Sequence, residues 1–65
     1  MEWIDVNVKL PEEGVSVLVF NSNNNRIEIR DLLSKEYKTW MSRVSGFYIK
    51  GDISHWMFLP EKPFL

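Results

Sequence analysis

Residues 15–33 read VSVLVFNSNNNRIEIRDLL and decide the fold, because they hold two strand patterns separated by a turn. The first part, Val15–Phe20, is almost entirely β-branched or large and apolar, a composition that favours a β-strand. Its apolar residues fall on both faces, which is typical of a central strand with cover on each side. Asn21–Asn25 follows with four asparagines, and asparagine tolerates the positive φ angles of hairpin turns. The stretch therefore predicts a β-hairpin.

The second arm of this hairpin alternates between apolar and charged residues. We expect Ile27 and Ile29 to point toward the core, while Arg26, Glu28 and Arg30 point to solvent. Residues 31–36, DLLSKE, fit either one short helical turn or a continued strand, because periodicity does not separate the two at this length.

Four further segments have the composition of short strands. WIDVNVKL alternates over residues 3–10, and ISHWMFL at residues 53–59 is stopped by a proline. YKTWMS at residues 37–42 and GFYIKG at residues 46–51 lie between them, and Gly46 and Gly51 mark the ends of the second of these segments. The sequence predicts a single, mainly β domain over residues 1–65, a small antiparallel meander of four to five short strands.

Aromatic side chains are the main material for a core in this chain of 65 residues. Domains of this size usually need disulfides, metals, partners or dense packing to offset the entropy of folding. The chain has no cysteine, which excludes disulfides and thiolate metal sites. We expect Trp3 and Trp56 in the core, whereas Trp40 has polar neighbours and fits the core and the surface equally well.

The charge balance argues against a nucleic-acid partner. The formal net charge is −1, whereas proteins that bind duplexes normally carry a basic patch. The N-terminal residues lack the pattern of a signal peptide, and no apolar stretch approaches the roughly 20 residues of a membrane helix. We therefore expect a cytoplasmic protein without a nucleic-acid or membrane partner.

Few residues could support catalysis. One histidine and no cysteine leave a metal site mainly to carboxylates, and Asp5, Asp31 and Asp52 lie in unrelated contexts. Ser54 and His55 are the most suggestive pair, but neighbours in a strand project to opposite faces, so we expect no hydrogen bond between their side chains. The sequence predicts no enzymatic activity, no metal and no cofactor.

Arginines and aromatic residues are the candidates for a binding surface, since both are enriched at interfaces. Arginines would meet carboxylates or phosphates, and rings would fill a partner's pocket. The residues expected to contact a partner or ligand are Arg26, Arg30, Trp40, Arg43, Tyr48 and His55. The open edges of a small sheet can also pair with a second copy, so we expect a homo-oligomer, with a dimer favoured.

Both ends of the chain carry a recognisable pattern. W-I-x-V-x-V-x-L-P-E-E-G-x-x-V-L-V spans residues 3–19, and S-H-W-M-x-L-P-E-x-P spans residues 54–63. Together they resemble domain-of-unknown-function family 551, a small domain that occurs largely in phages and bacterial prophages, with departures at Phe58 and Lys62, where proline is common. The resemblance implies that the two ends meet in the fold, with Trp3 against Trp56.

The family resemblance implies an accessory protein of a phage or prophage but no particular activity. The main hypothesis is a non-catalytic protein that binds a host protein, as an inhibitor of antiviral defence in the host cytoplasm. The alternative hypothesis is an oligomer that sequesters a nucleotide-like small molecule between aromatic and arginine side chains.

Overall fold

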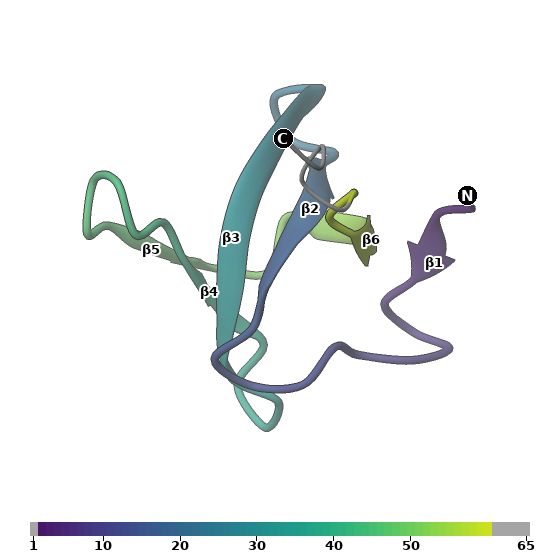
Figure 1. Ribbon diagram of the computed structural model, residues 1–65, viewed down its shortest axis with the longest axis horizontal. Helices are drawn as coiled ribbons and strands as arrows, with labels where there is room; N and C mark the ends of the chain where they lie inside the picture. Colours follow the sequence, from purple (N-terminus) through teal and green to yellow (C-terminus); the bar gives the residue numbers. More distant parts are fainter. Residues whose placement is uncertain (1, 61–65) are drawn as a thin grey trace, which may run out of the picture.

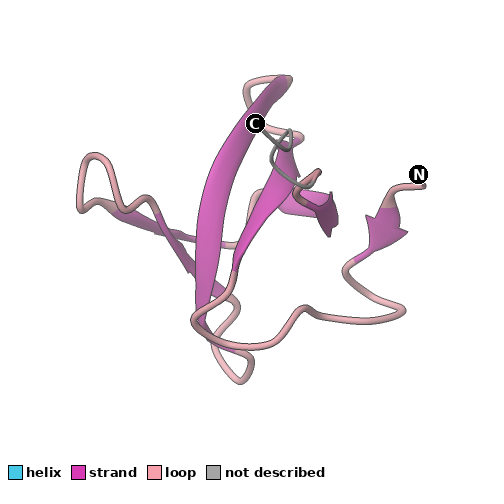
Figure 2. Ribbon diagram, viewed as in Figure 1, coloured by secondary structure: helices cyan, strands magenta, loops and turns pink. Residues whose placement is uncertain are grey.

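The computed structural model describes residues 2–60 and consists of strands, turns and loops (Figures 1 and 2). The strands are β1 (Ile4–Asp5), β2 (Ser16–Asn21), β3 (Arg26–Ser34), β4 (Thr39–Met41), β5 (Tyr48–Lys50) and β6 (Ile53–Phe58). All neighbouring strands are antiparallel. The prediction of a mainly β antiparallel fold is confirmed. Within the described residues, no helix is long and apolar enough to cross a membrane.

The strands form one six-stranded sheet in the order β1-β6-β2-β3-β4-β5. Strands β2 to β5 are a meander, but β6 then returns to the other side of β2, and β1 lies outside β6 (Figure 1). The sequence predicts a small meander of four to five strands, whereas the structure has six strands, and β6 and β1 depart from the meander order. The return of β6 makes β2 a central strand, as its apolar composition indicates.

The β2–β3 hairpin forms where the asparagine tract predicts it. Asn21 Oδ1 accepts a hydrogen bond from the Asn23 amide at 2.9 Å, and Asn25 has the positive φ of 60° that such a turn requires. Strand β3 then continues to Ser34, so the alternative of a helical turn over residues 31–36 is wrong. The strand continues because Leu32 pairs with Trp40 of β4, and the side chains of both residues are buried in the core.

One face of the curved sheet, here called the inner face, holds the core. Its fully or nearly buried apolar residues are Val17, Val19, Leu32, Trp40, Ile53 and Trp56, and Ile4, Val6, Leu10 and Ile49 pack against them. The expectation for Trp56 is confirmed, and the structure assigns Trp40 to the core.

The orientation predicted for β3 was inverted. Val17 pairs with Arg30 and Val19 pairs with Glu28, so these charged residues share the inner face with the buried valines. Ile27 and Ile29 lie on the opposite, outer face with 61% and 56% of their surface exposed. Alternation shows which residues share a face, but only pairing with β2 decides which face is covered.

The N-terminal strand is shorter than its alternating sequence suggests. Asp5 ends it, because its carbonyl oxygen accepts from the amides of Val8 and Lys9 and folds the chain into a turn. Val8 is consequently 82% exposed instead of part of a strand. Further along, the Lys9 carbonyl accepts a 2.8 Å hydrogen bond from Trp56 Nε1, which joins the two ends of the chain.

Trp3 differs from its prediction in both burial and contact. It is 40% exposed, and its ring packs edge-on against Phe20 with the centroids 6.4 Å apart. Trp56 instead packs edge-on against Phe58 at 5.0 Å. The reason is that Trp56 points to the inner face, whereas Phe20 alternates with the buried Val19 and points to the outer face.

Candidate interaction surface

The outer face of the sheet carries an open hollow of about 370 Å³ lined by Trp3, Phe20, Ile27 and His55. The register explains this grouping, because Phe20 of β2 pairs with Ile27 of β3 on one side and with His55 of β6 on the other. Trp3 reaches the same place from the N-terminal segment, where its ring meets Phe20.

The apolar surface extends beyond the hollow along the same strands. Leu18 lies two residues before Phe20 on the same face, and it pairs with Ile29 and Met57. We define the outer apolar face by the following residues: Trp3, Leu18, Phe20, Ile27, Ile29 and Met57. The core on the inner face contains none of them.

His55 makes a contact that the sequence analysis excluded. Its Nδ1 lies 2.8 Å from Ser54 Oγ. The pairing of β6 with β2 shifts at this point, since Phe20 pairs with His55 but Asn21 pairs with Ile53. The extra residue is Ser54, and such an irregularity breaks the strict alternation of side chains. Neighbouring side chains can then meet.

The Ser54–His55 contact sets a serine hydroxyl beside an imidazole at the rim of the hollow. Serine hydrolases use such a pair, but they also need a group that orients the histidine and donors for the oxyanion. Asp5 pairs with His55 across β1 and β6, yet its Oδ1 accepts from the Asn7 amide at 2.8 Å. Within residues 2–60, no group of three or more histidine, aspartate or glutamate residues could hold a metal ion.

Arg30 is committed to contacts inside the protein. Its Nε donates to Glu28 Oε1 at 2.9 Å, and its Nη1 donates to the carbonyl oxygens of Trp40 and Phe47 at 3.4 Å. Its side chain is mostly buried. Arg30 thus joins β3 to β4 and to the residue before β5.

Arg43 is similarly engaged by the sheet. It donates through Nε to Asp31 Oδ2 and through Nη2 to the Gly14 carbonyl at 2.9 Å. Asp31 is nearly fully buried and also accepts from Ser16 Oγ at 2.6 Å. Buried carboxylates need such partners because desolvation is costly, so Arg43 satisfies a structural acid on β3.

The six residues proposed from the sequence do not form one site. Arg26 is exposed at the start of β3, and Tyr48 is exposed on β5, at the opposite end of the sheet order from β6 and its His55. Trp40 is in the core, so its ring is not available to a partner. Of the six, only His55 lines the hollow.

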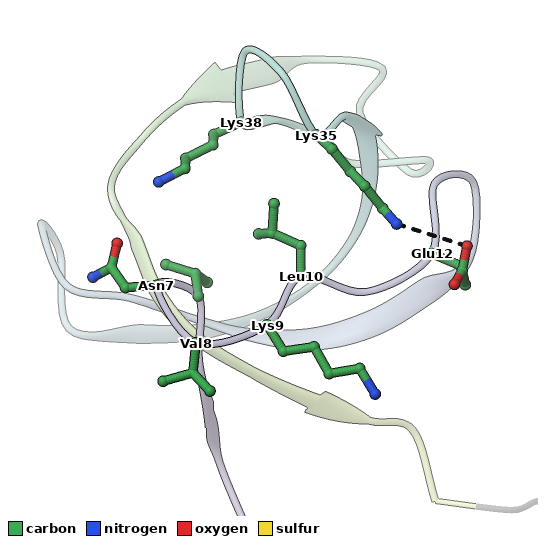
Figure 3. Close-up of a pocket in the computed structure, with 8 residues that line it drawn as sticks. Asn7, Val8, Lys9, Leu10, Glu12, Lys35 and Lys38 are labelled. Atoms are coloured by element: carbon green, nitrogen blue, oxygen red, sulfur yellow. Dashed lines mark ion pairs between the residues drawn. The ribbon is translucent and has the colours of Figure 1, made fainter.

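A second hollow, of about 540 Å³, carries lysines and lies near the N-terminal turn (Figure 3). The Leu10 side chain points into the hollow, which the backbone encircles, but the side chains of the surrounding lysines do not point toward one another. Lys35 is turned to Glu12, with Nζ 3.8 Å from Oε2, and Lys9 points away from Lys38. Divergent charges of this kind do not form a common anion site.

Comparison with known proteins identifies the family. Residues 2–64 match the family model described as "Protein of unknown function (DUF551)". The chain belongs to the DUF551 family. A relative, the "Uncharacterized 7.8 kDa protein in ral-gp17 intergenic region" of Salmonella phage P22, is 39% identical over 67 residues, covering 97% of each chain. This places the chain among small phage proteins of unknown function, as the terminal motifs indicate. No solved structure matches the DUF551 chain.

The outer apolar face of this DUF551 protein was not predicted from the sequence. Its signal was present in β2, where apolar residues occupy both faces, which we interpreted as cover on each side. The cross-strand partners of Leu18 and Phe20 are Ile27, Ile29, Met57 and His55, and the two isoleucines are exposed. An apolar strand face without an apolar layer above it is a signal for a partner.

Proposed function

We propose that this protein is a non-catalytic phage accessory protein that binds a host protein through the outer apolar face. The exposure of Ile27 and Ile29 supports this proposal, because small proteins seldom leave adjacent large apolar side chains open without a use for them. Ile27 lines a preformed hollow together with Trp3, Phe20 and His55, and Ile29 lies beside Leu18 on the same face.

The target class follows from the phage setting. A small β domain can affect a host by occupying the surface of a host protein. We propose inhibition of a component of antiviral defence, in the cytoplasm of the host bacterium. The absence of cysteine is compatible with a reducing compartment.

Binding accounts for the site better than catalysis does. Asp5 Oδ1 is occupied by a backbone amide, and no side chain other than the Ser54 hydroxyl is hydrogen-bonded to His55 among residues 2–60. An aromatic and aliphatic lining with one polar group is typical of a recognition pocket.

Sequestration of a nucleotide-like molecule is the second candidate, since a hollow of about 370 Å³ is within the range of ligand pockets. Such a ligand carries phosphates, and none of the described residues that line the hollow is an arginine. Arg30 and Arg43 are bound to Glu28 and Asp31. The geometry therefore supports a protein partner more than a phosphorylated ligand.

We also propose that two copies pair along β5. Antiparallel pairing centred on Ile49 would put Tyr48 of each copy opposite Lys50 of the other. The exposed Tyr48 ring and the Lys50 ammonium attract each other in such a pair. This edge lies at the opposite end of the strand order from β1 and β6, so a dimer of this kind leaves the outer hollow open.

The test is quantitative affinity capture from host cells with three forms of the protein: wild type, Ile27→Lys and Val8→Lys. Val8 is the matched control, because it is also exposed and apolar but lines the lysine hollow instead. We expect one host protein to be retained at fixed stoichiometry by wild type and Val8→Lys, and lost with Ile27→Lys. Equal retention by all three forms, or retention of none, would overturn the proposal.

A further inference from the structure

Strand β3 is longer than the strands beside it, which leaves part of one edge open. It pairs with β2 from Arg26 to Asp31, but with β4 only from Asp31 to Ser34. Figure 1 shows β4 and β5 leaving β3 from its lower half, while the upper half continues alone on that side. Among residues 2–60, no strand pairs with residues 26–30 at this edge.

The hydrogen bonds of β4 show which backbone groups face the open edge. Ser42 N donates to the Phe47 carbonyl, and Gly51 N donates to the Lys38 carbonyl. The backbone groups of the even-numbered residues from 38 to 42 therefore point to β5. Met41 therefore faces β3, where its partner is Asp31. The backbone N–H and C=O groups of successive residues in an antiparallel strand point alternately to its two sides. Those of Ile27 and Ile29 therefore point to the same side as those of Asp31, which is the side of β4 and of the open edge.

A groove accompanies these free groups. A hollow of about 510 Å³ lies between residues 27–30 on one wall and Ser42, Val44 and Ser45 on the other. The second wall is held in place, since Gly46 N donates to the Ser42 carbonyl at 2.8 Å. Arg30 Nη1 also bridges from β3 to the Phe47 carbonyl, which fixes the separation of the two walls.

We infer that this groove accepts an extended segment of a partner protein as an additional strand beside residues 27–29 of β3. Strand addition satisfies the backbone groups of Ile27 and Ile29, and side chains at alternate positions supply specificity. The segment carries apolar residues at alternate positions, which extend the outer apolar face beside Ile27, Ile29 and Val44. This inference deepens the proposed function by giving the mode of binding to the host protein.

In the register centred on Glu28, a second copy of this chain meets a charge conflict at this edge. Two-fold pairing of residues 27–29 would place Glu28 directly opposite Glu28 of the other copy, and like charges at facing positions are destabilising. Pairing of β5 with itself has no such conflict.

The test uses a capped hexapeptide of alternating threonine and valine as the probe, with NMR hydrogen exchange on the full protein. In the free protein, the amides of Glu28 and Arg30 exchange slowly because they face β2, while those of Ile27 and Ile29 exchange fast. At millimolar probe, Ile27 and Ile29 become protected. Absence of this protection, or protection at Tyr48 and Lys50 alone, overturns the inference.

A backbone variant provides the matched control. Chemical synthesis of the full chain allows an ester to replace the amide that carries the Ile29 N–H, which removes one donor and keeps the side chain. We expect probe affinity to fall by about 5- to 10-fold, the usual effect of one hydrogen bond. The same ester at Tyr48, a residue of the β5 edge, leaves affinity unchanged. An unchanged affinity with the Ile29 ester overturns strand addition.

The two levels of the proposal fail in different ways. If the captured host protein binds but leaves the Ile27 and Ile29 amides exchanging fast, the host-binding function stands and strand addition is wrong. If no host protein is captured but the hexapeptide protects both amides, the groove is real and the proposed function is wrong.

Discussion

Glu28 and Arg30 form an ion pair on the inner face of the sheet, with Nε 2.9 Å from Oε1, while the isoleucines beside them face outward. The pair lies next to the valines of the core, where an unpartnered charge would be costly. Arg30 also donates to two backbone carbonyls, so its guanidinium is a structural group.

Replacement of Arg30 by methionine should therefore destabilise the fold. We expect a loss of about 1.5–3 kcal/mol in the free energy of unfolding, because Glu28 and two carbonyl oxygens lose a charged donor. Urea denaturation measures it. The double variant Glu28→Gln, Arg30→Met should recover part of the loss, since it removes the unpaired carboxylate. If Arg30→Met left the free energy of unfolding unchanged, this result would contradict the placement of Arg30 on the inner face.

Threonine substitutions test which face of the hairpin is covered. Ile27→Thr should change stability by less than about 1 kcal/mol, because Ile27 is largely exposed. Val19→Thr should cost about 1–3 kcal/mol, because it places a hydroxyl in a fully buried site. Thermal unfolding of the two variants should separate them clearly. Equal losses would mean that both faces are buried.

The hydrogen bond from Trp56 to the Lys9 carbonyl fixes the N-terminal segment to β6. Trp56→Phe should lower the free energy of unfolding by about 2–3 kcal/mol, from lost volume in the core and from the unpaired carbonyl. Trp3→Phe is the control, and it should cost less than about 1 kcal/mol since Trp3 is partly exposed. Circular dichroism against urea measures both, and the reverse order would contradict the assignment.

The Ser54–His55 contact provides a test of the non-catalytic proposal. We expect the protein to hydrolyse p-nitrophenyl acetate no faster than an equal concentration of free imidazole, because no third group among residues 2–60 is hydrogen-bonded to the histidine side chain. Ser54→Ala should leave that rate unchanged. A rate well above imidazole that is lost in Ser54→Ala would establish a serine nucleophile.

Pairing along β5 predicts a dimer in solution. Light scattering at micromolar concentrations should give twice the mass of the chain. Tyr48→Pro should give a folded monomer, because it removes an N–H that faces the open edge and not β4. Tyr48→Phe should remain dimeric. A monomeric wild type would remove this part of the proposal.

The sequence was sufficient to predict the hairpin and most strands, because β-branched runs and the asparagine tract act locally. The orientation of Ile27 and Ile29 could not be predicted, since alternation is symmetrical between the two faces and only pairing with Val17 and Val19 breaks that symmetry. The position of β6 beside β2 is also a long-range property.

The candidate site was harder to predict than the fold. Arg30 and Arg43 looked available because their acidic partners, Glu28 and Asp31, appeared as ordinary surface residues in the sequence. The contact of His55 with Ser54 depends on a shift in strand pairing that leaves no local signal.

The central claim is that the outer apolar face meets a host protein, and photo-crosslinking in infected or producing cells tests it most directly. A photoreactive residue replaces Ile27 in one form and Val8 in another. The account predicts a crosslink to a single host protein from position 27 and none from position 8. Crosslinks from position 27 only to other copies of this chain, or the same pattern from both positions, would contradict it.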